Sequence, residues 1–324
     1  MSQKAVLGSS RKKSQPMDEQ WILIKLISMQ NSKRSCPCCN NVGALRFPSK
    51  IDDSLLSSKS YSSRKIPELM HYSYFECVNC RTLFVDELPS SEFLENSYNE
   101  AEFVSRKDSV YAAQTYFEEL QHLKLLHSGK LLDIGCSDGA FISIVKSKSA
   151  VEVAGIEPSI NAISSSDLSV RENIQHTTLE SFQSKHSFNI VTCFQTIEHV
   201  NDLNGLVVKS KELLLDQGHL VFVCHDRLSL VNRILGERSP IFDIEHLQIL
   251  NKRGVQLLLQ MNGFVDVKVN SISNKYPISY WLLLAPIPKF LKTFIDGKRN
   301  EWYLSWGIRI RVGNLLAVGT LHAG

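Results

Sequence analysis

The sequence lacks any run of about 18 apolar residues, the length that a membrane-spanning helix requires. Its first stretch, Met1 to Pro16, contains the basic Arg11–Lys13 but no apolar core of the kind that a secretory signal has. The formal net charge of the 324 residues is only +3, so the chain as a whole has no strong positive electrostatic field to attract nucleic acid. These absences exclude a spanning helix and an ordinary signal peptide, so we expect a cytoplasmic protein.

The sequence is long enough, and contains enough apolar side chains, for about two globular domains. Hydrophobic residues make up 43% of the chain, an ordinary value that is ample for a core. There are eight cysteines. In a protein expected to be cytoplasmic, they indicate metal binding or buried thiols rather than disulfides.

Two C-x-x-C pairs stand out among the cysteines, Cys36 with Cys39 and Cys77 with Cys80. Each pair forms a tight knuckle, and four thiolates around a tetrahedral ion favour zinc. Four ligands leave no open position, so the predicted zinc is structural. Cys38 is a spare that is either no ligand or a competitor of Cys39. The alternative is that all of these are free buried thiols.

The stretch from Leu131 to Phe141 predicts a buried strand, a glycine-containing turn and the start of a helix. This arrangement brings backbone N–H groups up to a polar ligand. A dinucleotide site would need G-x-G-x-x-G, whereas the order here is Asp133, Gly135, Ser137 and Gly139 at alternate positions. That order resembles the first motif of class I S-adenosylmethionine (SAM) methyltransferases, [D/E]-x-G-x-G-x-G, with serine at the middle glycine.

A second strand, Val151–Glu157, ends in an acid that can accept hydrogen bonds from both ribose hydroxyls of a nucleoside. It indicates an adenosine-type ligand, and the resemblance implies that this ligand is SAM. The resemblance places the adenine pocket near the end of a third strand at 174–178. The predicted cofactor-binding residues are Asp133, Gly135, Ser137, Gly139, Glu157, Thr178, Leu179 and Gln195.

A fourth strand, Ser187–Phe194, runs into Gln195–Val200 and resembles the F-D-x-V…E-H-V stretch of small-molecule methyltransferases, including quinone O-methyltransferases. Asn189 replaces the usual aspartate. Some relatives have E-x-x-E-H here and hold a divalent cation, but the first carboxylate is Gln195 in this chain, which argues against magnesium. No [D/N]-P-P-[Y/F] motif follows the strand, which argues against N-methylation of a base or amide.

The resemblance implies an α/β fold, a doubly wound, seven-stranded Rossmann-like sheet whose last strand is antiparallel, with a small N-terminal zinc-ribbon-like module. We expect a tail with a short apolar segment over 1–33, the four-cysteine module over 34–90, and the methyltransferase domain over 91–324 with a helical insert at 271–311. The apolar segment Trp21–Met29 is either a packed helix or a membrane-surface contact.

Within the insert, Tyr280–Ile295 is apolar and aromatic and carries Lys289 and Lys292. Three interpretations remain open. The segment is a helical cap over the acceptor pocket, an amphipathic contact with a membrane surface or a lipid-linked acceptor, or a packing or dimer face. The sequence does not predict an oligomeric state.

A hydroxyl or activated-carbon acceptor needs a base of near-neutral pKa, a role that histidine suits. The candidates follow strand ends or loops at the carboxyl edge of the predicted sheet, where ligands bind. They are, in order, His199, His246 and His225. The alternative for each is a capping or core histidine. Tyr98, which precedes the first strand of the sheet, is a candidate lid contact.

The layout resembles sugar C-methyltransferases and methyltransferases of polysaccharide and secondary-metabolite biosynthesis. The expected function is methyl transfer to O or C of a small-molecule, sugar or lipid-linked acceptor, with no nucleic-acid partner. Two alternatives remain. One is an RNA methyltransferase that grips RNA with the zinc module, and the other is a SAM-binding scaffold without catalysis.

Overall fold

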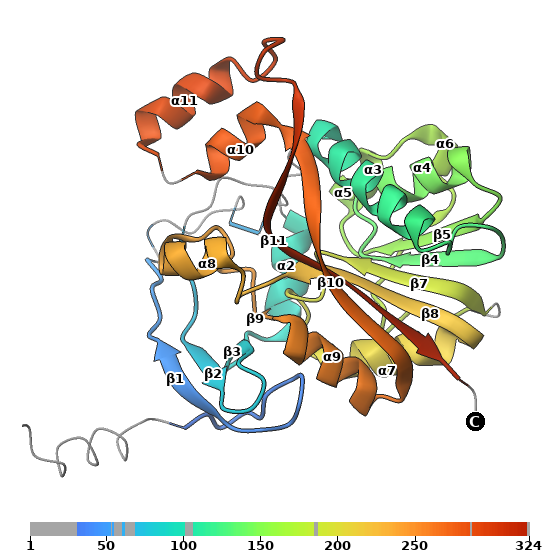
Figure 1. Cartoon of the computed structure of the whole chain (residues 1–324), viewed down its shortest axis with the longest axis horizontal. Coiled ribbons are helices and arrows are strands. Elements are labelled where there is room, and N and C mark those ends of the chain that lie inside the picture. The colour runs from blue at the N-terminus through green and yellow to red at the C-terminus, as the bar shows by residue number, and fades with distance from the viewer. Residues whose placement is uncertain are drawn as a thin grey trace, which may run out of the picture.

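The computed structural model describes residues 31–52, 54, 60–61, 69–100, 106–184, 187–285 and 287–322. The predicted apolar segment at 21–29 lies outside these residues. The larger of two sheets has seven strands in the order β6-β5-β4-β7-β8-β11-β10 (Figure 1). Their bounds are β4 Lys130–Ile134, β5 Glu152–Glu157, β6 Ile174–His176, β7 Phe188–Phe194, β8 Leu214–His225, β10 Phe264–Pro277 and β11 Gly307–Leu321.

The first five strands of this sheet are parallel, and β11 runs antiparallel to both β8 and β10. The predicted seven-stranded Rossmann-like sheet with its antiparallel last strand is therefore confirmed. In the sheet, β4 has β5 as its neighbour on one side and β7 as its neighbour on the other. This arrangement opens a crevice at the carboxyl ends of β4 and β7, where doubly wound sheets bind ligands.

Helices cover both faces of the sheet, and each face has its own core. One core joins the strands to α3 (Arg106–His122) and α4 (Ala140–Lys148). The other joins them to α7 (Leu203–Leu213) and α9 (Lys252–Met261). The remaining helical segments are α2 Ser91–Glu100, α5 Ile160–Ser164, α6 Leu168–Arg171, α8 Leu230–Leu235 and the 3-10 turn η2 Gly236–Arg238.

The smaller sheet has the order β1-β2-β3-β9 and carries the cysteine pairs. Its strands are β1 Gly43–Phe47, β2 Tyr74–Cys77, β3 Leu83–Val85 and β9 Gln248–Ile249. The fourth strand, β9, comes from the chain between β8 and α9 of the larger domain. The four-cysteine module and the larger domain therefore share backbone hydrogen bonds through the β3–β9 pair.

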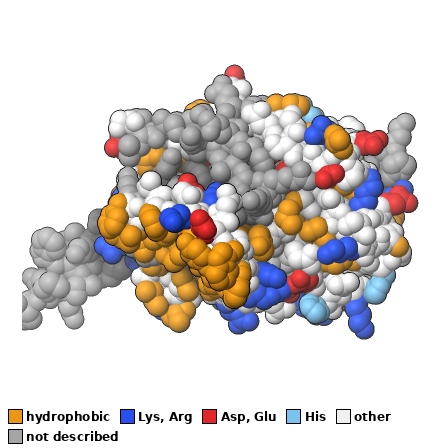
Figure 2. Space-filling view, turned by 90° about the horizontal axis from the view of Figure 1, so that it is seen from above, with side chains coloured by type: hydrophobic (Ala, Val, Ile, Leu, Met, Phe, Trp, Pro, Cys, Tyr) orange, Lys and Arg blue, Asp and Glu red, His pale blue; other side chains and the backbone are white. Residues whose placement is uncertain are grey.

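Strands β10 and β11 pair with each other well beyond the larger sheet, as far as Pro277 and Gly307. We call this paired extension of β10 and β11 the arm. The helices of the predicted insert, α10 (Ile278–Leu284) and α11 (Lys289–Gly297), lie at its end, at the top of Figure 1. Hydrophobic side chains gather on the left of the face seen from above in Figure 2, the side on which α11 lies. Among the described residues, no helix is long and apolar enough to cross a membrane.

Candidate active site

The turn after β4 is built from three residues with positive φ: Gly135 at 69°, Ser137 at 54° and Gly139 at 69°. A Cβ on Gly135 would lie 2.6 Å from Oγ1 of Thr196, so only glycine fits there. Ser137 adopts the same left-handed conformation at a cost of about 1–2 kcal/mol relative to the right-handed region. The conformation explains why the resembling motif has glycine at this position.

Glu157 ties this turn to the end of β5. It is only 8% exposed, and its two carboxylate oxygens accept hydrogen bonds from the backbone N–H groups of Ser137 (2.8 Å) and Ser159 (2.9 Å). Burial raises the pKa of Glu157, and the two N–H groups oppose that shift. Asp133 is also buried, and it accepts a hydrogen bond of 2.7 Å from Oγ1 of Thr192. Burial raises the pKa of Asp133 to about 7.

A small hollow opens beside the turn, between β4, α4 and the covering helix α3. Its lining contains three of the eight predicted cofactor-binding residues, Asp133, Gly135 and Ser137. The other five do not line it: Gly139, Glu157, Thr178, Leu179 and Gln195. The full lining is Ser109, Ala112, Ala113, Tyr116, Asp133, Gly135, Cys136, Ser137, Asp138, Ala140, Phe141 and Phe194.

The hollow and its surroundings fit a polar, nucleoside-like cofactor. Within the described part of the chain, Oγ of Ser137 and Nε2 of Gln195 are buried without a hydrogen-bond partner. Both follow the carboxyl ends of neighbouring strands, β4 and β7. Buried polar atoms are normally satisfied, so these two have bonding capacity for a ligand. Sequence analysis missed Ser109 on α3, whose hydroxyl donates to Oδ2 of Asp138 at 2.6 Å and fastens that helix over the turn.

The three candidate histidines come from separate segments of the chain and pack into one cluster. The ring centroid of His246 lies 4.9 Å from that of His199 and 5.2 Å from that of His225. Nδ1 of His246 lies 2.8 Å from the carbonyl oxygen of Ile241. A carbonyl only accepts, so Nδ1 carries the proton and Nε2 is the ring atom with a lone pair. Nδ1 of His225 lies 3.0 Å from Oδ1 of Asn314.

His199 has the most polar surroundings of the three. Its Nδ1 lies 3.1 Å from the hydroxyl of Tyr98 and 3.7 Å from Oε2 of Glu245. The predicted candidate Tyr98 thus meets a candidate base, and burial raises the pKa of its phenol well above the usual value. Sequence analysis missed Glu245 and Tyr61, whose ring lies edge-on to that of Tyr98 at 5.8 Å. Tyr61 follows a serine-rich stretch without helical or strand periodicity, so no sequence signal marked it.

The four-cysteine module donates two hydrogen bonds to the backbone of the loop that carries His246. The hydroxyl of the fully buried Tyr74, on β2, donates to the carbonyl oxygen of His246 at 2.6 Å. The N–H of Val85, on β3, donates to the carbonyl oxygen of Leu247 at 2.9 Å. The histidine cluster is therefore built partly on the larger sheet and partly on the module.

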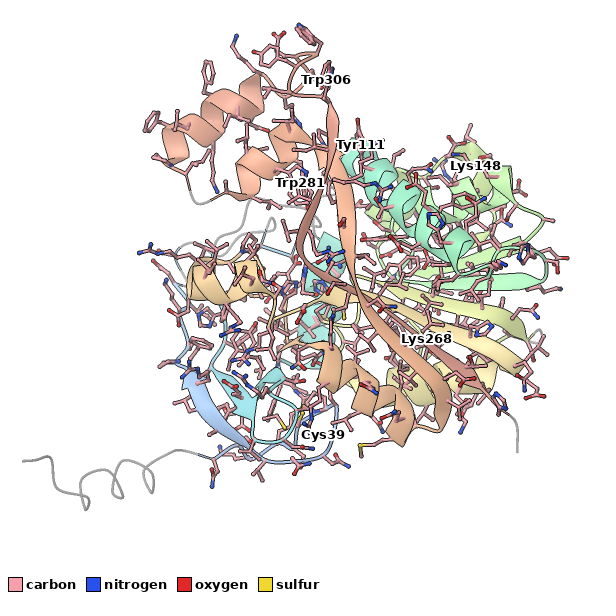
Figure 3. All side chains as sticks on the ribbon, in the orientation of Figure 1. Cys39, Tyr111, Lys148, Lys268, Trp281 and Trp306 are labelled. Carbon is pink, nitrogen blue, oxygen red and sulfur yellow. The ribbon has the colours of Figure 1, made fainter. Side chains whose placement is uncertain are left out.

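The sulfur atoms of Cys36, Cys39, Cys77 and Cys80 all lie within 4.8 Å of one another, and all four residues are buried. Two of the distances are 3.5 Å (Cys36 to Cys80) and 3.4 Å (Cys39 to Cys77). All eight cysteines of the chain are described and none forms a disulfide. Cys38 is not part of the cluster, and its sulfur faces Gly254 on α9. Figure 3 shows Cys39 at the base of the small sheet.

Comparison with known proteins agrees with this geometry. Residues 110–269 match the family described as "Methyltransferase domain". An uncharacterized protein of Methanocaldococcus jannaschii is 26% identical over 207 residues, which are 61% of this chain and 84% of the relative. A ubiquinone biosynthesis O-methyltransferase of Aromatoleum aromaticum is 32% identical over 100 residues, 29% of this chain and 42% of that enzyme. The chain thus spans less than half of that enzyme's length.

Among solved structures, a SAM-dependent methyltransferase of Archaeoglobus fulgidus is 16% identical and aligns with a TM-score of 0.45 over 72% of this chain and 100% of its own. The matched segment 110–269 runs from α3, through the turn after β4 and Glu157, to β10, and contains all three histidines and every residue that lines the hollow except Ser109. Residues 110–269 therefore match a methyltransferase domain, and the seven-stranded sheet that they help to form is Rossmann-like.

Proposed function

We propose that this chain transfers the methyl group of SAM to an oxygen or activated carbon of a small-molecule, sugar or lipid-linked acceptor. The observation that carries the proposal is the histidine cluster. Three imidazoles from separate segments meet at the carboxyl edge of the sheet, one shortly after β7 and one at the last position of β8. A site that methylates a hydroxyl or an acidic carbon needs a base at this edge. O-methyltransferases among the relatives support the same class of acceptor.

The bound cofactor would supply an electrophilic methyl group on a sulfonium, which leaves as a neutral thioether. Little oxyanion stabilisation is then needed, and positioning provides most of the acceleration, up to about 7–11 kcal/mol. His199 is the first candidate to take the acceptor's proton. Glu245 faces its Nδ1 at 3.7 Å and would stabilise the imidazolium that forms. His246 and His225 follow in that order.

Glu157 and the turn after β4 would bind the ribose and the methionine end of the cofactor. Glu157→Gln removes the negative charge but keeps the size of the side chain. We expect the Kd for SAM, measured by calorimetry, to rise at least about tenfold, because a charge-assisted bond to a hydroxyl contributes about 1.5–3 kcal/mol. Glu152→Gln on the same strand is the control, since its side chain is 74% exposed. Equal affinities for the two variants would contradict the site.

We also propose that the four sulfurs hold one structural zinc ion. A tetrahedral Zn–S distance of about 2.3 Å places sulfurs about 3.8 Å apart, which matches the observed spacing. Elemental analysis of the purified protein should find about one zinc per chain. Cys77→Ser should lose this zinc, and Cys38→Ser should keep it. Zinc retained in Cys77→Ser would contradict the assignment.

The acceptor class is tested by incubating the protein and labelled SAM with extracts separated into glycolipid, sugar-nucleotide, small-molecule and RNA fractions. Label in one of the first three fractions supports the proposal, and label in RNA alone overturns it in favour of an RNA methyltransferase. SAM binding without labelling of any fraction indicates a scaffold. With the labelled acceptor, His→Ala at positions 199, 246 and 225 tests the base at saturating SAM. A wild-type kcat for all three would remove histidine from the mechanism.

A further inference from the structure

At the end of the arm, α10, α11 and the turn that leads into β11 expose several aromatic side chains. On α11, Phe290 is 71% exposed and Phe294 is 62% exposed. On the following turn, Trp302 is 67% and Trp306 is 63% exposed. Leu291, Tyr303 and Ile308 are also exposed. Such a concentration of exposed aromatics on one lobe is unusual for a surface that faces only water.

Three of the aromatic side chains, those of Trp302, Tyr303 and Trp306, lie against one another. The ring centroids of Trp302 and Trp306 lie 5.9 Å apart, and those of Trp302 and Tyr303 lie 5.8 Å apart. Nζ of Lys298 lies 5.5 Å from the ring centroid of Phe294. We call this surface, made by Phe290, Leu291, Phe294, Trp302, Tyr303 and Trp306, the aromatic lobe. Figure 3 shows Trp306 at the outer end of the arm, away from both sheets.

The charge around the aromatic lobe is predominantly positive. Residues 287–311 contain six Lys or Arg and two Asp or Glu, although the chain as a whole has a net charge of only +3. Arg311 is exposed, and so is Lys298 beside Phe294. Asp296 is paired with Arg299 at 3.6 Å, and Arg309 is paired with Glu118 on α3, so four basic residues and one acid of this segment lie outside these two pairs. A partner for this surface therefore has to be apolar and anionic at once.

We propose that the aromatic lobe docks on an anionic phospholipid bilayer. Tryptophan and tyrosine favour the headgroup region, where their rings meet both apolar and polar surroundings. A short helix with phenylalanine on one face and lysine beside it lies in the plane of that region, and each basic residue near anionic lipid adds attraction. Protein partners of this surface would need a matching acidic and apolar groove, whereas a bilayer offers both properties without shape complementarity.

The arm also connects this surface to the cofactor site. The hydroxyl of Tyr111 on α3 donates to the carbonyl oxygen of Ser305, between Trp302 and Trp306. The same helix lines the hollow beside β4 with Ser109, Ala112, Ala113 and Tyr116. A docked lobe would thus hold the site close to a membrane-resident acceptor. This last point rests on the proposed function, but the docking itself does not.

Co-sedimentation of the full chain with vesicles tests the docking. The wild-type protein should pellet with vesicles of phosphatidylcholine and phosphatidylserine, and less so with pure phosphatidylcholine or at high salt. The triple variant Phe290→Ser, Phe294→Ser, Trp302→Ser should lower the partition coefficient at least about tenfold, because each buried aromatic contributes about 1.5–3 kcal/mol. The matched control is Leu168→Ser with Met261→Ser, which removes apolar groups that are 75% and 58% exposed on α6 and α9.

Three results would overturn the proposal. The wild-type protein does not pellet, the triple variant pellets as the wild type does, or the control loses as much binding as the triple variant. Light scattering adds a fourth. A dimer that the triple variant abolishes, without any vesicle binding by the wild type, assigns the aromatic lobe to a second copy of the chain. SAM affinity and labelling activity in solution should be the same in the triple variant and the wild type, which separates failure of docking from failure of the proposed function.

Discussion

At the scale of single residues, the turn after β4 is where backbone conformation determines side-chain identity. Gly135 has positive φ and no room for a Cβ beside Thr196, whereas Ser137 has positive φ with a side chain already in place. Gly135→Ala should lower the free energy of unfolding by about 1–3 kcal/mol in urea titrations. Ser137→Gly should change it by less than about 1 kcal/mol, because relief of strain offsets the extra freedom of the unfolded chain. An equal effect of both changes would contradict this account of the turn.

Buried Asp133 makes stability depend on pH. An acid in an unfolded chain has a pKa of about 3.9, whereas burial raises the folded pKa to about 7. Between these values the folded chain keeps a proton that the unfolded chain has released. Stability therefore falls as pH rises through this window, by up to about 1.4 kcal/mol per pH unit, and this contribution levels off above it.

Asp133→Asn should remove this contribution, because asparagine has no proton to lose and can still accept the hydrogen bond from Thr192. Urea unfolding at pH 5 and pH 8 measures it, with the exposed Asp266→Asn as control. The wild type and the control should both lose more stability between the two pH values than Asp133→Asn does. The same loss in all three proteins would show that Asp133 is ionised in the folded state.

The turn after β4 could be predicted from sequence because the relation between its residues is local. Asp133 to Gly139 lie on one strand end and one turn, and Glu157 follows one helix later. The neighbours of His199 could not be predicted in the same way. Tyr61 and Glu245 are far from His199 and from each other in sequence, and only tertiary packing brings them close. Thr178 and Leu179 were placed by analogy, and they do not line the hollow.

At the scale of elements, the segment from β8 to α9 joins the two parts of the protein. Arg227, which follows β8, donates to both carboxylate oxygens of Glu76 at 3.1 and 2.7 Å and to the carbonyl oxygen of Arg81 at 2.9 Å. Asn251 donates to the carbonyl oxygen of Cys80 at 2.9 Å. The two-residue strand β9 lies between them. A strand this short has no periodic pattern, so the sequence indicated two separate units instead of a shared sheet.

Arg227→Met should lower the free energy of unfolding by about 1–3 kcal/mol, because the partly buried Glu76 loses its bidentate partner. Arg81 and Arg46 remain as partners of Glu76 and limit the loss. Arg253→Met is the matched control. Arg253 also connects α9 to a cysteine knuckle, through Asn79 at 2.8 Å, but it is exposed, and we expect a change within about 0.5 kcal/mol. Urea unfolding measures both. Equal stability of the two variants would mean that the bidentate contact contributes little to the junction.

At the scale of the whole molecule, the two proposed ligands bind to different parts of one connected structure. Every residue that lines the hollow beside β4 belongs to the methyltransferase part, from Ser109 to Phe194. The histidine cluster, in contrast, depends on Tyr74 and Val85 of the four-cysteine module. Loss of order in the module should therefore disturb the acceptor side and spare the cofactor side.

Removal of zinc tests this division. A structural zinc site contributes on the order of 10 kcal/mol to the order of its module, so the metal-free module should lose its fold around the four sulfurs and release the His246 loop. After extraction with a thiol reagent and chelator, we expect the Kd for SAM to stay within about threefold, while methyl transfer falls at least about 100-fold, the size expected when a base is misplaced. Adding zinc after thiol reduction should restore transfer. Transfer that survives extraction would show that the histidines keep their geometry without the module, and loss of SAM binding would show that both sides depend on the metal.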